Sequence, residues 1–223
     1  MRIFLIVLLS LSINKFAYSQ KSEIGNWFVY FGNQKINRNW NWHNEIQYRN
    51  YDFIGDTNQI LLRTGIGYNL TENNNNVLIG YGFINTQKYI PDSDQKQESN
   101  EHRIFQQYIK KKNFGRFYFL NRFRMEQRFL SDDFQIRLRY FLNINIPLNK
   151  KTLEKNAIYL STYNEVFVNT ENKLFDRNRI YAALGFVINK NCKVEAGIMS
   201  QSLVQSNRNQ FQIVIFNNLP FNN

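Results

Sequence analysis

The chain has 223 residues, 43% of them hydrophobic, and no shift in composition along it suggests a second domain. Its net charge of +11 favours binding to anionic lipid headgroups or an interior that attracts anions. A basic protein can also bind nucleic acid, but the export signal described in the next paragraph argues against that partner. A single cysteine, Cys192, excludes an internal disulfide, and with only two histidines, His43 and His102, we expect no metal site and no cofactor.

Residues 1–19 have the pattern of a secretory signal peptide. Arg2 precedes an apolar run at residues 3–13, and Ala17 and Ser19 form the small-x-small pattern that signal peptidase reads. The run is shorter than the roughly 20 residues of a transmembrane helix, which disfavours an N-terminal anchor. No cysteine lies near the cut site, which disfavours a lipoprotein. We therefore expect a signal peptide at residues 1–19 and a single mature domain at residues 20–223.

The mature chain alternates apolar and polar residues with a period of two, which is typical of β-strands. Eleven segments show the pattern, at residues 24–31, 40–49, 59–70, 77–89, 102–110, 116–129, 134–146, 157–169, 177–188, 193–201 and 209–219. Turn-forming residues separate them at 71–76, 111–115, 131–133 and 189–191. A polar stretch at residues 91–100 is the expected largest loop.

The clearest segment is residues 134–146. Phe134, Leu138 and Tyr140 belong to its apolar face, while Arg137 and Arg139 belong to the opposite, mostly polar face. Its length of about thirteen residues exceeds the roughly 5–6 residues of an average soluble strand and is enough for a tilted transmembrane strand, which needs about 9–11. Pro147 has no N–H to donate and is expected to end the strand.

Long strands, polar faces rich in arginine with interspersed carboxylates, and aromatic apolar faces together predict an all-β fold, an antiparallel transmembrane β-barrel. Single-chain bacterial barrels have an even number of strands, so the eleven segments predict 10–12 strands, with one segment either non-spanning or missed. Short turns at 71–76, 111–115 and 189–191 are expected on the periplasmic side, and 91–100 and 170–176 outside. The alternative architecture is a soluble periplasmic β-sandwich that binds a ligand.

Five sequence runs point to a known family: EHRIFQQ at residues 101–107, RFRMEQR at 122–128, RLRY at 137–140, NEVFVN at 164–169 and FDRNR at 175–179. Together they resemble the motif set of an uncharacterised outer-membrane family, domain of unknown function 2490. The resemblance covers essentially the whole mature chain. It implies a small barrel in the outer membrane of a Gram-negative cell, and it implies no activity.

The polar faces predict a charged interior. Besides Arg49, Arg63, Arg103, Glu45 and Glu195, the expected charge cluster consists of Arg122, Arg124, Glu126, Arg128, Arg137, Arg139, Glu165 and Arg179. One interpretation is a structural plug, in which ion pairs close a narrow lumen. The other is a porin-like path for small solutes that favours anions, since rings of arginine select anions.

An enzyme remains a second hypothesis, as a membrane-embedded hydrolase acting on lipid. His43 with Glu45, or His102 with Glu101, are the candidate histidine–carboxylate pairs. No Gly-x-Ser-x-Gly motif ties either pair to a serine, so a non-enzymatic barrel is the favoured hypothesis. The expected partners are outer-membrane lipid and lipopolysaccharide, the barrel-assembly machinery during biogenesis, and a small anionic solute.

Overall fold

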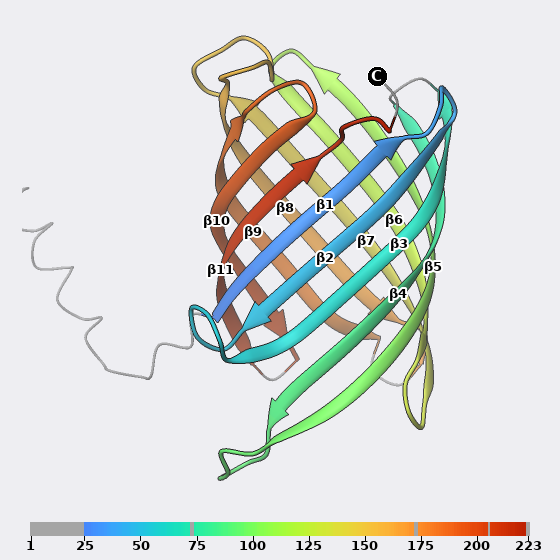
Figure 1. Cartoon of the computed structure of the whole chain (residues 1–223), viewed down its shortest axis with the longest axis vertical. Coiled ribbons are helices and arrows are strands. Elements are labelled where there is room, and N and C mark those ends of the chain that lie inside the picture. Colours follow the sequence, from blue (N-terminus) through green and yellow to red (C-terminus); the bar gives the residue numbers. More distant parts are fainter. Residues whose placement is uncertain (1–24, 72–73, 172–173, 205, 222–223) are drawn as a thin grey trace, which may run out of the picture.

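The computed structural model describes residues 25–71, 74–171, 174–204 and 206–221, and these form one closed β-barrel (Figure 1). The expected signal peptide, residues 1–19, lies outside the described residues. The strands are β1 (Gly25–Lys35), β2 (Trp40–Asn50), β3 (Thr57–Thr71), β4 (Asn75–Tyr89), β5 (Lys96–Phe114), β6 (Phe117–Phe129), β7 (Phe134–Pro147), β8 (Ile158–Asn169), β9 (Phe175–Val187), β10 (Cys192–Leu203) and β11 (Asn207–Asn217). Within these ranges, no helix is long and apolar enough to cross a membrane.

Each strand pairs antiparallel with its neighbours in sequence, and β1 pairs with β11 to close the barrel. The predicted antiparallel barrel of 10–12 strands is confirmed, and each of the eleven predicted segments corresponds to one strand. The expectation of an even number is wrong, because the described residues form eleven strands. Successive hairpins reverse direction, so with eleven strands the first and last run the same way. They meet in a parallel seam from Gly25↔Gln210 to Gly32↔Asn217.

The odd strand number places the start of β1 and the end of β11 at opposite ends of the barrel (Figure 1). We call the end that carries the β1–β2, β3–β4, β5–β6, β7–β8 and β9–β10 turns and the end of β11 the C-terminal rim. The other end is the N-terminal rim. The three short turns predicted to share one side all lie at the C-terminal rim. That this side faces the periplasm remains a prediction.

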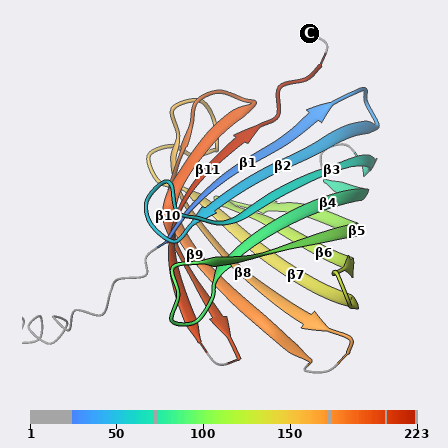
Figure 2. The ribbon, with the colours of Figure 1, turned by 60° about the horizontal axis from the view of Figure 1, so that its bottom comes forward.

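The β4–β5 hairpin differs from its prediction. Residues 91–100 are not the largest loop, because β5 begins at Lys96 and pairs with β4 as far as Tyr89↔Lys96. The longest connection between described strands is instead residues 148–157, between β7 and β8. The hairpin projects beyond the N-terminal rim (Figures 1 and 2). A ladder there needs only backbone hydrogen bonds, so it continues where the alternating apolar pattern has stopped.

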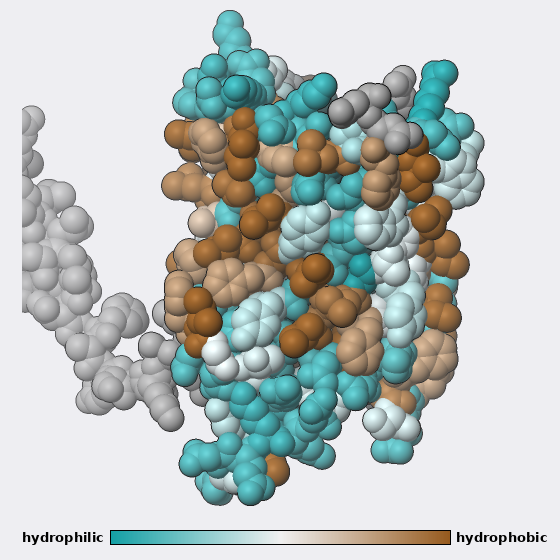
Figure 3. Space-filling model, viewed as in Figure 1, coloured by the Kyte–Doolittle hydropathy of each residue, from teal (hydrophilic) through white to brown (hydrophobic). Residues whose placement is uncertain are grey.

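The two faces of the barrel wall have opposite chemistry. Outward side chains such as Leu184 and Ile198 are about 60% and 63% exposed, and apolar residues gather in a band around the middle of the visible face (Figure 3). Inward side chains such as Arg137 and Gln212 are buried. The apolar surface thus faces outward and the charged surface inward, the reverse of a soluble protein.

A glycine on β9 makes room for a buried tyrosine. Gly185 is the direct cross-strand partner of Tyr159 on β8, and a Cβ at position 185 would lie 2.1 Å from the tyrosine Cζ. The ring therefore lies flat over the glycine, and its hydroxyl donates a 2.9 Å hydrogen bond to Glu195.

Gly185→Val is expected to displace this ring and break the bond to Glu195, lowering the free energy of unfolding by about 1–3 kcal/mol. Urea unfolding in lipid vesicles measures the change. Leu184→Val, one residue away on the outer face, is the matched control and should leave the midpoint nearly unchanged. Equal effects of the two substitutions would contradict the packing role of Gly185.

Candidate functional site

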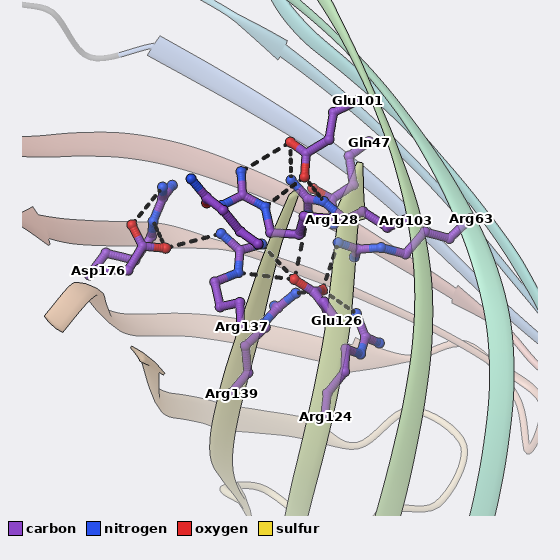
Figure 4. A network of polar contacts seen from close by, with 12 residues as sticks. Gln47, Arg63, Glu101, Arg103, Arg124, Glu126, Arg128, Arg137, Arg139 and Asp176 are labelled. Carbon is purple, nitrogen blue, oxygen red and sulfur yellow. Dashed lines mark hydrogen bonds and ion pairs between the residues drawn. The ribbon is translucent and has the colours of Figure 1, made fainter. Parts of the chain in front are cut away.

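The interior of the barrel is crossed by a network of arginines and carboxylates (Figure 4). The two-residue period of the strands turns these side chains inward. All eight predicted cluster residues belong to it: Arg122, Arg124, Glu126, Arg128, Arg137, Arg139, Glu165 and Arg179. We call this set, together with Glu45, Arg63, Glu101, Arg103 and Asp176, the interior network.

Glu126 on β6 lies at its centre with no exposed surface. Arg137 Nη2 and Arg139 Nη1 on β7 each donate to its carboxylate at 2.5 Å. Arg63 Nη2 on β3 reaches it at 3.4 Å, from three strands away. The guanidinium groups of Arg103 and Arg124 lie 3.7 Å from it. One carboxylate therefore holds together five guanidinium groups from four strands.

Glu165 on β8 forms a second centre. Its Oε1 accepts from Arg139 Nη2 at 2.6 Å and from Arg122 Nη2 at 2.7 Å, and Arg179 lies 3.6 Å from its Oε2. Arg139 donates to both Glu126 and Glu165, and so links the two centres. Each of these buried carboxylates accepts several charge-assisted hydrogen bonds, which offset the cost of removing it from water.

Two carboxylates of the interior network, Glu101 and Asp176, were not among the charged residues predicted to face the interior. Glu101 accepts from Arg103 Nε and Arg128 Nε, both at 2.6 Å, and Asp176 accepts from Arg137 Nη1 at 3.0 Å. Glu101 lies two positions before Arg103, and that spacing places both on one face of a strand. The sequence therefore contained the spacing that pairs Glu101 with Arg103, but Glu101 borders the stretch at 91–100 that was predicted as the largest loop. Asp176 lies in the predicted connection at 170–176.

Aromatic rings make cation–π contacts with several arginines of the interior network. Arg139 lies 4.4 Å and Arg179 4.7 Å from the ring centre of Phe167, and Arg124 lies 4.6 Å from that of Phe105. Both rings are almost completely buried. Their π-faces stabilise guanidinium groups that outnumber the carboxylates around them.

A cavity of about 630 Å³ lies between the interior network and the C-terminal rim, and we call it the chamber. Arg124, Arg139, Glu165 and Arg179 form its floor, and Asn74, Asn113, Asn191 and Asn218 lie at its mouth. Glu101, Arg103, Arg128 and Arg137 do not line it, because they lie nearer the N-terminal rim on their strands. On the side of β5 to β7 the interior network therefore lies between the chamber and the N-terminal rim, whereas on the side of β1 and β2 the lining extends to Trp27 and Gln47.

The two histidines lie on opposite sides of the barrel wall. His43 faces the interior, 3.6 Å from Glu45, whereas His102 is exposed on the outer face, where its Nδ1 lies 2.5 Å from the hydroxyl of Tyr81. No hydrogen bond of the described residues joins either histidine to a serine. No group of three or more potential metal ligands occurs within the described ranges.

Comparison with protein families gives one match: residues 24–212 fit the model described as "Protein of unknown function (DUF2490)". Searches of curated proteins and of solved structures give no match.

Proposed function

The chain belongs to the DUF2490 family, whose function is unknown, and from this premise we propose that it is an outer-membrane β-barrel with a closed lumen. In this proposal the interior network is a structural plug that braces the wall and blocks free passage of solutes. An anion-favouring path through the lumen is the competing function, and the same experiment tests it.

The outer face supports a place in a membrane. A soluble monomer rarely exposes a contiguous apolar patch larger than a few hundred Å². Yet this barrel exposes Ile79 on β4 and Leu184 on β9, each to roughly 60%, and these two strands lie far apart around the wall. Lipid chains would cover such a surface without cost. The same feature argues against the soluble periplasmic sandwich.

The expected export signal, together with the apolar band, supports the outer membrane as the location. Helical membrane segments are the rule elsewhere in bacteria, whereas strands that alternate apolar-out and polar-in are typical of outer-membrane barrels. The proposed partners are outer-membrane lipid and lipopolysaccharide on the outer wall, and the barrel-assembly machinery during insertion.

The observation that carries the closed lumen is the burial of Glu126. Its carboxylate lies inside a barrel, where an open channel would wet it, and yet it has no surface that water can reach. Arg124 and Arg137 beside it are 3% exposed. A continuous aqueous path at this level would require these groups to separate.

Single-channel recording in planar bilayers tests the proposal. The refolded mature chain is expected to show no reproducible open steps, while the same preparation migrates as a folded, heat-modifiable barrel in gel electrophoresis. An open porin recorded in parallel is the positive control. Anion-selective steps that lose their selectivity in Arg139→Glu would overturn the plug and establish the anion path instead.

A further inference from the structure

The chamber has two unlike walls. Towards β1, β9 and β11 it is apolar, and the lining includes Val29, Phe31, Tyr181, Val214 and Phe216. The rings of Phe31 and Phe216 stack at 5.4 Å between their centres. This wall is unusual for the interior of a barrel, where water or polar groups are the normal content. It offers a dry surface to an apolar molecule.

The remainder of the chamber is strongly basic. Three acidic side chains line it, Glu45, Glu165 and Glu195. Eight basic side chains line it, Lys35, Arg63, Lys111, Arg122, Arg124, Arg139, Arg179 and Lys193. A lining with this excess of positive charge attracts anions, and the closed barrel wall concentrates the field.

Three of these cations lie outside the interior network, and they are Lys35 at the end of β1, Lys111 and Lys193. Lys193 on β10 lies 3.8 Å from Glu195 and 4.3 Å from the ring centre of Phe216, at the edge of the apolar wall. Lys111 on β5 makes no ion pair with any described residue, and the charges of Lys111 and Lys193 repel each other. An anionic group between them would relieve this repulsion, with apolar surface directly beside it.

We propose that the chamber binds an amphipathic anion, with its acidic head between Lys111 and Lys193 and its apolar body along the wall of Phe31 and Phe216. A small inorganic anion would leave the apolar wall wet, and a neutral apolar molecule would leave Lys111 without a counter-charge. The volume of about 630 Å³ lies within the range of roughly 300–1,000 Å³ typical of small-molecule sites. The proposal rests on the closed lumen, because the interior network is the floor of the site.

Dodecanoate binding to the barrel in lipid nanodiscs tests the proposal, measured by titration calorimetry against empty nanodiscs. Saturable binding of one dodecanoate is expected, with dodecanol and acetate each binding at least about tenfold more weakly, since each lacks one of the two interactions. The double variant Lys111→Gln/Lys193→Gln should weaken dodecanoate about tenfold or more. The interior network stays intact in this variant.

The matched control is Lys112→Gln/Lys190→Gln. It removes two positive charges at the same rim, from side chains that are exposed and do not line the chamber, and it should bind dodecanoate as the wild type does. An equal loss in both double variants would overturn the proposal, because general surface charge would then explain the binding. Acetate binding as tightly as dodecanoate, or dodecanol doing so, would also overturn it.

The result of the dodecanoate experiment can be distinguished from the result of the conductance experiment that tests the closed lumen. A barrel that conducts ions but binds dodecanoate with the predicted lysine dependence refutes the plug and retains the site. A barrel that is silent in bilayers and binds no dodecanoate retains the plug and refutes the site.

Discussion

Glu126→Gln is expected to lower the free energy of unfolding by about 3–5 kcal/mol or to prevent folding. The substitution keeps the shape of the side chain but leaves Arg137 and Arg139, now 2.5 Å from a neutral amide, without their shared counter-charge. Removing one partner of a buried ion pair costs far more than the pair contributes, because the remaining charges stay desolvated. Urea unfolding in lipid vesicles, followed by tryptophan fluorescence, measures the loss.

Two further variants test whether the loss of stability in Glu126→Gln comes from its buried ion pairs. Glu154→Gln makes the same charge change in the 148–157 loop, where Glu154 is 58% exposed and 3.6 Å from Lys150, and it should alter stability by no more than about 0.5 kcal/mol. Adding Arg139→Gln to Glu126→Gln should restore part of the stability, because one uncompensated cation is then removed. A Glu126→Gln barrel as stable as the wild type would contradict the structural role of the interior network.

Cysteines at positions 29 and 214 are expected to form a disulfide in nearly every molecule. Val29 on β1 and Val214 on β11 are direct partners in the parallel seam, and both point into the barrel. Neighbouring strands lie about 4.8 Å apart, within reach of the Cα separation of roughly 4.4–6.8 Å that disulfides require. The variant Val29→Cys/Val214→Cys, built with Cys192→Ser, should migrate faster in non-reducing gels after denaturation.

The register control moves one cysteine by a single residue. Val29→Cys/Ile213→Cys places the second thiol on the opposite face of β11, where it should not cross-link. Failure of the 29–214 pair to link, in a folded barrel, would show that β1 and β11 do not close as a parallel seam.

The face that each strand turns inward could be predicted from the sequence, and the partners on that face could not. Arg137 and Arg139 stand out because the residues around them alternate strictly with Phe134, Leu138 and Tyr140. Period two is a local property of the backbone, and so a single segment reveals it. Contacts such as Arg63 with Glu126 join strands three apart, and they depend on the curvature of the closed wall.

The two wrong expectations have distinct physical causes. The length of β5 was underestimated because Lys96–Asn100 has no apolar face, although its backbone pairs with β4 like any other strand. The even number came from a rule about where chain ends lie, and not from any feature of these residues. Gly25–Gly32 forms its hydrogen bonds with β11 in a parallel ladder, which closes the barrel with an odd number of strands.

The parallel seam also determines how the barrel could connect two compartments. Gly25 begins at one rim and Asn217 ends at the other, so in the proposed membrane the start of β1 and the end of β11 lie on opposite sides. A barrel with an even number of strands returns both ends to the same side. In the proposed membrane location, this barrel is topologically equivalent to a single crossing, and domains fused to its two ends are expected to be held apart by the thickness of the membrane.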